Sequence, residues 1–574
     1  MPNLIYFAPI GSKHAKKIWR LQKRLFSPEL RESLQEIREI LVNTEQHMVC
    51  NLSFGLFDNT DMVGYVFAYV ESESLFYQRE EEVIYIKEIA LLPAYETYFR
   101  RICFKLYKQW SAFTPNMPLE AHAMQESLEV WQRLIRLFRY FGLTLTATAE
   151  KRQEGRPPYQ LLRLDVAKET ASLSEQIKAL PKERWHFRDD ISVSLVTDSR
   201  QWLSLKPYWN GLLRLTDDYN VFQSFEYLWE WWKYFGIWND LWIIVIRRGE
   251  SIIGVVPLMR EYFPTFGKTV RNLMFITAKM EMSRPKLIFG KDSATCLPAF
   301  LAYLEDNEES WEMLDIDEQL QNETTDTLRT HFRHLGCLIG ESETLCPYID
   351  LRSTWDRFLM GCSTKMRSNI KRLRRRLASV GDVEIRRVTS WPELDSSLDI
   401  HCEIEERSWK ASKNLVLSSN KSHYFFYKGL ATVFGKNGQF ELRMLDCNGQ
   451  PLASTFGIVY DDAFQSLKIT HDSEYDKFSP GTLLESYELE DLFGRNLSCY
   501  EFMGSFLTNK LRWTSSVHKT VNVHIYRREP RLMLHFFYSF VFKRRVKVLL
   551  KKTGQFERVD RLLKRLHNSP LTWH

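Results

Sequence analysis

Helix-like and strand-like patterns alternate along most of this chain, and that alternation limits the folds open to it. Residues 18–41 repeat apolar positions at helical spacing, whereas residues 51–58, 62–72 and 83–93 have the aromatic and β-branched composition of strands. Such alternation is typical of proteins in which helices cover a sheet. The 574 residues suffice for roughly three or four domains. The sequence therefore predicts an α/β (α+β) protein with mixed central sheets flanked by helices.

Breaks in this pattern divide the chain into domains. The polar residues 166–190 interrupt the alternation and indicate a linker after a first domain, residues 1–165. A second block of strands and helices spans residues 191–345, and a third spans residues 346–530. The remaining residues, 531–574, form a basic tail.

Composition excludes several classes of protein. The 78 basic and 72 acidic residues leave a net charge of only +6, which indicates no particular partner. Nine cysteines occur without a C-x-x-C pair or histidines at zinc spacing, so we expect reduced thiols and no metal site. The N-terminus lacks the pattern of a secretion signal, and no apolar run approaches the roughly 20 residues that cross a bilayer. These features predict a cytoplasmic protein, soluble or peripherally bound to a membrane.

A strongly basic helix is predicted at residues 363–377, STKMRSNIKRLRRRL. Its apolar residues recur at helical spacing, so one stripe can be buried while the cations face outward. Lys365, Arg367 and Arg372 belong to this cationic set, which contains no acid. A solvated face, an anionic-substrate site and a nucleic-acid contact all remain open interpretations.

A second helix is predicted to begin within HDSEYDKFSPGTLLE, residues 471–485. Ser479 suits the N-cap position and Pro480 the first helical position. Gly481 and Thr482 would then leave the first turn open to a ligand, where unpaired amides and the helix dipole favour phosphate. The alternative is an ordinary helix start with no ligand.

The strand and helix order of residues 1–165 resembles the GNAT acyltransferase fold. That resemblance implies a glycine-rich turn where a strand feeds the helix that receives the pyrophosphate of acyl-CoA. Here the corresponding stretch is PAYETYFRRICFKLY, residues 93–107, which contains no glycine. A Cβ at each position hinders close approach to phosphate. We expect a degenerate GNAT-like domain that has lost catalysis.

Residues 190–530 resemble the FemAB/CelD-like acyltransferases, a group with two GNAT units in tandem. An ordered set of residues carries the resemblance: Trp355, Ser363, Lys365, Arg367, Arg372, Ser408, Trp409, Lys410, His471, Asp472, Tyr475, Ser479, Pro480, Gly481, Phe502, Gly504, Lys510, Arg512 and Trp513. Residues 191–345 would be the first GNAT-like half, and residues 346–530 the second, catalytic half. Many relatives have Tyr-Asp and Asp-Phe where this chain has His471-Asp472 and Glu501-Phe502.

The resemblance implies transfer of an acyl group, from acyl-CoA as co-substrate, to an amine on a cell-envelope lipid or polysaccharide precursor. No permanently bound cofactor is expected. His471 or Glu501 would be the base, because either group can be tuned close to neutral pH. Asp472 would orient a neighbour, and Lys510 would complete the catalytic group by binding anions, since its ordinary pKa is high.

The remaining roles fall on two further sets of residues. Ser479, Gly481 and Thr482 would bind the donor. The substrate would contact Lys365, Arg367, Arg372, Trp409, Lys410 and Trp513.

Two other functions stay open at this point. Some relatives take their group from aminoacyl-tRNA, and the basic helix at residues 363–377 would suit that donor. The missing glycines of residues 93–107 instead favour a non-catalytic scaffold built from degenerate GNAT domains.

The tail combines aromatic and basic residues. Residues 531–566 form an amphipathic pattern whose aromatics could lie at a membrane interface while lysines and arginines meet anionic lipid. We expect peripheral contact with the inner membrane face, or alternatively a helix packed on the preceding domains.

Overall fold

The computed structural model describes most of the chain after residue 183 and parts of the sequence before it. The described residues are 5–10, 14–26, 31–38, 41, 53–58, 61–71, 83–99, 102, 105–106, 119–124, 146–147, 159–164, 184–188, 190–236, 239–265, 268–277, 283–391, 393–413, 415–419, 421–503 and 510–542.

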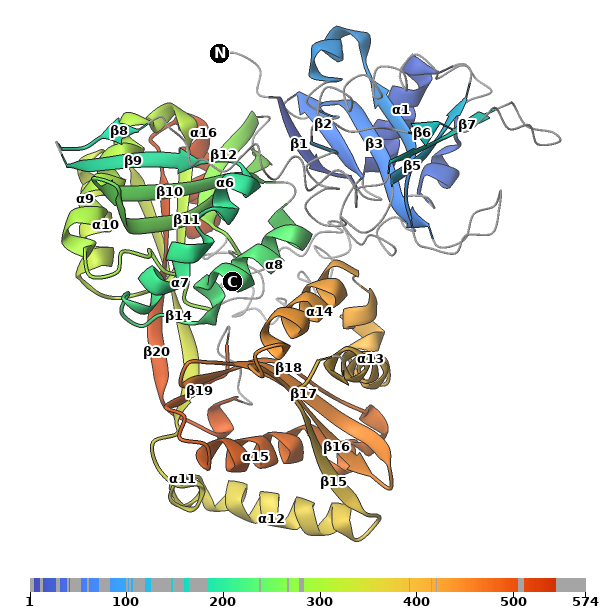
Figure 1. The fold of residues 1–574 in the computed structure, drawn as a ribbon, viewed down its shortest axis with the longest axis vertical. Coiled ribbons are helices and arrows are strands. Elements are labelled where there is room, and N and C mark those ends of the chain that lie inside the picture. The colour runs from blue at the N-terminus through green and yellow to red at the C-terminus, as the bar shows by residue number, and fades with distance from the viewer. Residues whose placement is uncertain are drawn as a thin grey trace.

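The N-terminal domain is built on a 7-stranded sheet of order β1-β2-β3-β4-β5-β7-β6 (Figure 1). Its elements are β1 (Ile5–Pro9), α1 (Ala15–Leu25), β2 (Phe54–Asp58), β3 (Asp61–Glu71), β4 (Val83–Leu91), η3 (Pro93–Tyr98), β5 (Leu119–Met124), β6 (Thr146–Ala147) and β7 (Tyr159–Leu164). The strands β1 to β4 form an antiparallel meander, after which β4 pairs with β5 in parallel. The glycine-free stretch after β4 begins with the short turn η3 rather than with a phosphate-cradling loop.

The rest of the chain shares one 13-stranded sheet, of order β15-β16-β17-β18-β19-β14-β20-β13-β12-β11-β10-β9-β8. The first half contributes β8 (Trp185–His186), β9 (Ile191–Val196), α6 (Ser199–Leu203), α7 (Lys206–Arg214), α8 (Phe225–Phe235), β10 (Asp240–Arg248), β11 (Ser251–Thr265), β12 (Lys268–Phe275), α9 (Ser293–Asp306), β13 (Met313–Leu320), α10 (Glu323–His334) and β14 (Leu338–Asp350). The predicted linker, residues 166–190, includes the short strand β8, and the predicted boundary at residue 345 falls within β14.

The second half repeats the meander. Its elements are α11 (Trp355–Gly361), α12 (Thr364–Ala378), β15 (Val383–Val388), α13 (Glu393–Glu406), α14 (Lys421–Gly435), β16 (Phe440–Cys447), β17 (Gln450–Tyr460), β18 (Ala463–His471), η10 (Ser473–Phe478), α15 (Pro480–Phe493), β19 (Cys499–Glu501), β20 (Val517–Tyr526), α16 (Pro530–Phe536) and η12 (Phe537–Phe542). In all three places a meander ends in a parallel pair: β4 with β5, β12 with β13, and β18 with β19. This mixed α/β architecture confirms the predicted fold class.

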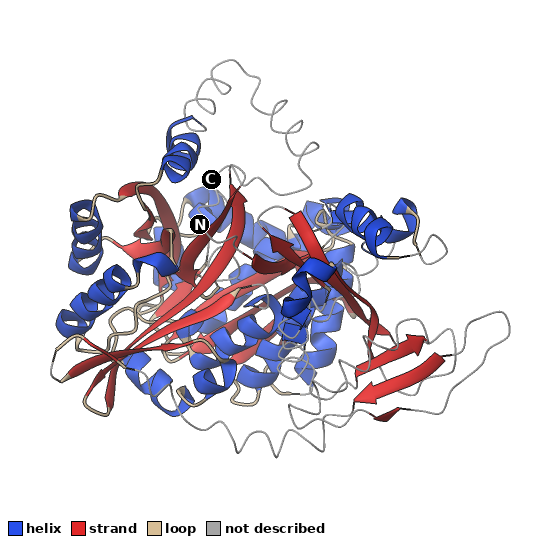
Figure 2. Ribbon diagram, turned by 90° about the horizontal axis from the view of Figure 1, so that it is seen from above, coloured by secondary structure: helices blue, strands red, loops and turns tan. Residues whose placement is uncertain are grey.

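Helices lie on both faces of the long sheet (Figure 2). In the second half, α13 and α14 cover one face of the strands, and α15 covers the other, with α12 packed against α15 (Figure 1). The halves also meet through α8 and α14, where the ring of Phe426 contacts Tyr227 and Phe235 at centroid distances of 5.6 and 5.4 Å. Both halves therefore contribute to one hydrophobic core.

Strand exchange interlocks the two halves. The strand β20, which follows the second half in sequence, pairs with β13 of the first half on one side and with β14 on the other. The last residues of β14 in turn pair with β19 of the second half. Neither half has a complete sheet without a strand from the other part of the sequence.

A buried ion cluster fixes α15 on the sheet. The carboxylate of Glu441 on β16 accepts hydrogen bonds from Arg387, Arg443 and Arg495. Arg443 also donates to Glu488 of α15, at 3.2 Å. Burial acts to raise the pKa of Glu441, but hydrogen bonds from Arg495 and Arg387 and the charge of Arg443 outweigh burial and lower that pKa to about 2.

We expect Glu441→Gln to destabilise the protein by about 1.5–3 kcal/mol, because three guanidinium groups lose the carboxylate they share, although the buried Arg443 keeps Glu488 and Asp491. The folded-state pKa lies below the ordinary 4.5, so this stabilisation is present above pH 4.5 and is lost as the pH falls towards 2. Chemical denaturation at pH 7 measures the loss. A control, Glu384→Gln on the exposed side of β15, should change stability little, and equal losses would contradict the assignment.

Candidate functional site

The parallel strands of the second half stay together over a short length only. Ala463, Phe464 and Gln465 of β18 pair with Cys499, Tyr500 and Glu501 of β19. Beyond this pairing β18 continues to His471, whereas β19 ends at Glu501. The turn η10 and the start of α15 follow β18 directly, so a helix N-terminus lies beside the strand ends.

A cavity of about 1070 Å³ opens at the start of α15. The end of α11, the first turns of α12, Thr482 of α15 and residues 511–515 line it. Its lining includes the cations Arg357, Lys365, Arg372 and Arg512, and no carboxylate. Serine, threonine and asparagine side chains supply further hydrogen-bond donors. These properties suit a ligand with several anionic groups.

The structure brings four of the predicted residues to this cavity: Lys365, Arg372, Thr482 and Trp513. Arg367, although on the same helix as Lys365, donates instead to the backbone oxygens of Met360 and Cys362, at 2.7 and 2.8 Å. It therefore caps the end of α11. Arg374 likewise turns away from the cavity to bind Glu490 of α15, at 2.7 Å.

The start of α15 differs in detail from the predicted N-cap. Ser479 occupies the cap position with φ 51° and ψ 54°, and its side chain makes no capping hydrogen bond. Gly481 is buried against His471, since a Cβ on this glycine would lie 3.2 Å from the ring Nδ1. Gly481 therefore makes room for the histidine. Thr482 is the residue of this turn that faces the cavity.

His471 and Asp472 have nearby partners. The Nε2 of His471 lies 2.9 Å from the carboxylate of Asp476. Asp472 is buried; it accepts from the Nε of Arg407 at 2.7 Å and from the amide of Glu474 at 3.0 Å. Asp472 thus caps η10, and its carboxylate holds the turn between β18 and α15 in place.

Trp409 and Lys410 lie outside the cavity lining. The ammonium of Lys410 donates to the buried carboxylate of Glu405 at 2.6 Å and to the backbone oxygen of Ile469 at 3.0 Å. These contacts tie α13 to β18. Trp409 is exposed and lies under the ammonium of Lys413, 4.8 Å from the ring centroid.

Glu485 is a residue that the sequence interpretation did not select. It lies one turn after Thr482, half-buried, and accepts a hydrogen bond from the indole Nε1 of the cavity residue Trp513. Burial raises the pKa of Glu485 to about 7; the bond from Trp513 and the charge of Lys510 oppose that rise, and the carboxylate of Glu488 adds to it. A carboxyl group with this pKa can accept a proton near neutral pH.

Lys510 lies near this carboxyl group. Its ammonium donates to the backbone oxygens of Phe502, at 2.8 Å, and Met503. Burial lowers the pKa of Lys510, and the charge of Glu485 opposes that shift. Lys510 thus holds the backbone just after β19 in place.

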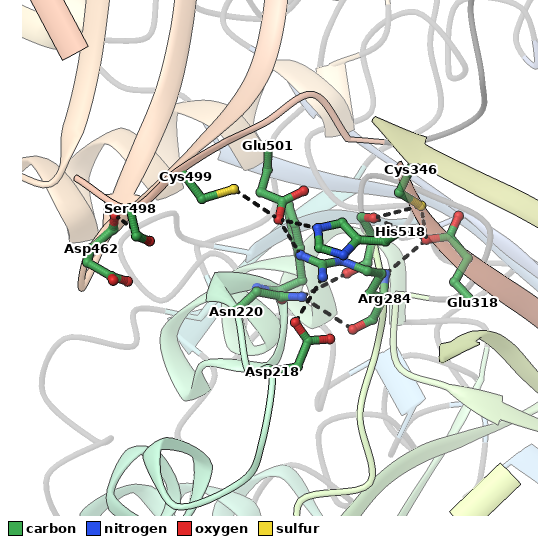
Figure 3. A network of polar contacts seen from close by, with 12 residues as sticks. Asp218, Asn220, Arg284, Glu318, Cys346, Asp462, Ser498, Cys499, Glu501 and His518 are labelled. Carbon is green, nitrogen blue, oxygen red and sulfur yellow. Dashed lines mark hydrogen bonds and ion pairs between the residues drawn. The ribbon is translucent and has the colours of Figure 1, made fainter. Parts of the chain in front are cut away.

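Glu501 belongs to a second polar cluster, on the side of β19 that faces the first half (Figure 3). Its Oε1 accepts from Arg284 at 2.7 Å and lies 3.0 Å from the Nε2 of His518. Arg284 also donates to Asp218 at 3.0 Å, and its backbone amide donates to Glu318 at 2.9 Å. The cluster therefore joins loops of the first half to β19 and β20.

Backbone conformation in this cluster is unusual. Asp218, Arg284 and Glu318 have φ of 53°, 50° and 48°, in the left-handed region that residues with a Cβ seldom adopt. Met503, just after β19, has φ 52°. Such strain persists only where the surrounding structure imposes it, and it concentrates at functional sites. The cluster is thus a second candidate feature, formed by residues outside the cavity lining.

The comparisons with known proteins bear on this half of the chain. Residues 364–510 match a family model described as an acetyltransferase (GNAT) domain. The second half therefore carries a GNAT domain. The matched residues include the cavity residues Lys365, Arg372 and Thr482, together with Glu485 and Lys510. None of the N-terminal domain falls within the match.

The solved structures that this chain partly matches share little sequence with it. FemX is 12% identical, with 59% of this chain and 96% of that chain covered at a TM-score of 0.41. A tandem GNAT protein from the clavulanic acid biosynthesis pathway is 11% identical, with 58% and 98% covered at 0.35. The C-terminal domain of a putative lysylphosphatidylglycerol synthetase from Agrobacterium fabrum is 10% identical, with 49% and 84% covered at 0.33. No curated protein matches the sequence.

In the described residues, no group of three or more histidine, cysteine, aspartate or glutamate side chains is placed so that it could hold a metal ion. The thiol of Cys499 is also unsuited to nucleophilic attack, because burial raises its pKa.

Proposed function

We propose that this protein is an N-acyltransferase that takes its acyl group from acyl-CoA and passes it to an amine. The observation that carries the proposal is the cavity of the GNAT domain, which has four cationic side chains, no lining carboxylate and a helix N-terminal turn. Coenzyme A carries several phosphate groups, and such a surface complements them. Phe358, Met366 and Trp513 add apolar surface for the uncharged part of the donor.

The reaction would need one proton acceptor and one leaving group. The amine nitrogen attacks the thioester carbonyl and forms the amide bond, the carbon–sulfur bond breaks, and the thiolate of CoA leaves. Glu485 does not line the cavity itself but bonds to the lining residue Trp513; with a pKa of about 7, it is our candidate to take the proton from the attacking amine through water. The positive charge of Lys510 would favour the negative charge that develops on the donor.

The acceptor we propose is an amine on a cell-envelope lipid or polysaccharide precursor, reached from the cytoplasm. The ordered motif set from Trp355 to Trp513, which resembles that of FemAB/CelD-like enzymes, supports this choice. An aminoacyl-tRNA donor is the second candidate, because Lys371, Arg375 and Arg376 of α12 are exposed and extend the cationic surface beyond the cavity.

The donor can be tested by thermal unfolding with acyl-CoAs of different chain length. A ligand at 100 times its Kd stabilises the folded state by about 2.7 kcal/mol, so the correct donor should raise the midpoint by several degrees. The double variant Lys365→Ala, Arg372→Ala should bind acyl-CoA at least about tenfold more weakly, because two charge-assisted contacts are lost.

Arg374→Ala is the matched control for this experiment, since it removes a cation from the same helix that binds Glu490 rather than lining the cavity. Equal loss of binding in the control would contradict the assigned cavity. Stabilisation by tRNA alone, with a steep salt dependence, would replace acyl-CoA with aminoacyl-tRNA as donor. No response to either ligand would favour the scaffold.

A further inference from the structure

The helix α16 and its continuation η12 are apolar on two faces. On one face, Leu532, Phe536 and Phe540 pack against the sheet, in a cluster that also contains Val270 and Tyr526. The contact is close: a Cβ on Gly340 of β14 would lie 2.4 Å from the ring of Phe540. These contacts hold the helix against β12, β13, β14 and β20 of the long sheet.

The opposite face is exposed. Leu534, Phe537, Tyr538 and Phe542 are 57%, 50%, 43% and 60% accessible to solvent. Four large apolar side chains within nine residues make a patch that a surface exposed only to water seldom carries. A helix with one packed and one exposed apolar face indicates a second surface that it meets.

The residues after Phe542 indicate what kind of partner surface the exposed face meets. Residues 543–552 contain six basic residues and no acidic one: Lys543, Arg544, Arg545, Lys547, Lys551 and Lys552. A second copy of this chain would bring the same positive charge to the contact and be repelled. An anionic lipid surface instead accepts both the apolar side chains and the basic charges.

No helix in the described part of the chain is long and apolar enough to cross a bilayer. We propose that the exposed face of α16 and η12 docks this protein onto an anionic membrane surface, a choice of partner that the basic composition of the sequence after Phe542 supports. This surface stands apart from the catalytic cavity, because α16 and α12 lie far apart along the long axis of the molecule (Figure 1). The proposal does not depend on acyl transfer.

Flotation of the full chain with vesicles tests the proposal. The wild type should float with vesicles of equal parts phosphatidylcholine and phosphatidylglycerol, should remain unbound with phosphatidylcholine alone, and should dissociate from the anionic vesicles at high salt. The double variant Phe537→Glu, Phe542→Glu should bind anionic vesicles at least about tenfold more weakly.

The control variant Leu203→Glu, Tyr208→Glu adds the same charge at positions that are 47% and 58% exposed elsewhere on the first half, and it should bind like the wild type. Equal weakening in both variants would overturn the proposal, as would equal binding to neutral and anionic vesicles. A wild-type dimer that the Phe537→Glu, Phe542→Glu change dissociates, without lipid binding, would assign the face to a second copy instead.

Discussion

Replacing Glu485 with glutamine should lower kcat for acyl transfer by about 10²- to 10⁴-fold while leaving donor binding largely intact. Glutamine keeps the size of the side chain and can still accept the hydrogen bond from Trp513, but it cannot take a proton from the amine. A steady-state assay of CoA release with a saturating amine measures kcat. Glu490→Gln, on the same helix but exposed, is the matched control.

The pH dependence of the same variant separates a base from a structural residue. The wild-type activity should fall on the acidic side of a pKa of about 7, because the protonated carboxyl group cannot act as base, and this limb should be absent in Glu485→Gln. Lower pH therefore reduces activity, whereas for the stability of the folded protein the same pKa shift makes lower pH favourable. The folded-state pKa is raised above the ordinary 4.5, so the stability contribution of Glu485 is fully present below pH 4.5 and is lost as the pH rises through about 7.

Glu485→Gln should therefore be at least as stable as the wild type at pH 8, where the wild-type carboxylate is charged and half-buried. A variant that loses both activity and thermal stability at this pH would show that Glu485 supports the fold. If the variant still loses activity below pH 7 as the wild type does, the base is another residue, such as His471 or Glu501.

Ending the chain at Ser516 should prevent folding of both halves, although all of residues 364–510 would remain. The truncation removes β20, whose side chains of Val521, Val523, Ile525 and Tyr526 are at most 3% exposed. Burial of one such side chain contributes about 1.5–3 kcal/mol, so their loss removes roughly 6–12 kcal/mol, as much as the net stability of a typical domain. It also leaves unpaired edges on β13 and β14.

A chain that ends at Phe542 is the control for this truncation, because it keeps β20, α16 and η12. We expect the shorter chain to aggregate and the control to remain in solution with cooperative thermal unfolding. A chain ending at Ser516 that unfolds cooperatively near the wild-type midpoint would show that the exchanged strand is not needed for the halves to fold.

Some residues of the candidate site could be placed from the sequence because their determinants are local. The spacing of apolar residues in α12 places Lys365 and Arg372 on its outward side, and Ser-Pro-Gly marks the start of α15. The cavity forms where these two local features meet. Arg367 and Lys410 carry the same charge as the cavity cations, but in the folded chain they bind the backbone oxygen of Met360 and the carboxylate of Glu405, contacts that residue type and helical spacing did not indicate.

Glu485 shows the limit of local patterns most clearly. In sequence it is one of several acids on α15, at no special spacing. Its pKa becomes distinctive only when folding buries it beside Trp513 and Glu488. The raised pKa is therefore a property of the packed structure.

The sequence by itself determined the mixed α/β class and the positions of the helix starts, because a period of 2 or 3.6 and a capping pattern depend on residues a few positions apart. The GNAT domain is likewise recognisable from the sequence, because residues 364–510 match an acetyltransferase (GNAT) family model. Only the tertiary structure decided that β14 and β20 interlock the halves, that Arg284 of the first half binds Glu501 of the second, and that Glu485 titrates near neutral pH. Strand exchange, ion pairing and burial each join residues far apart in sequence, and their free energies exist only once those residues are in contact.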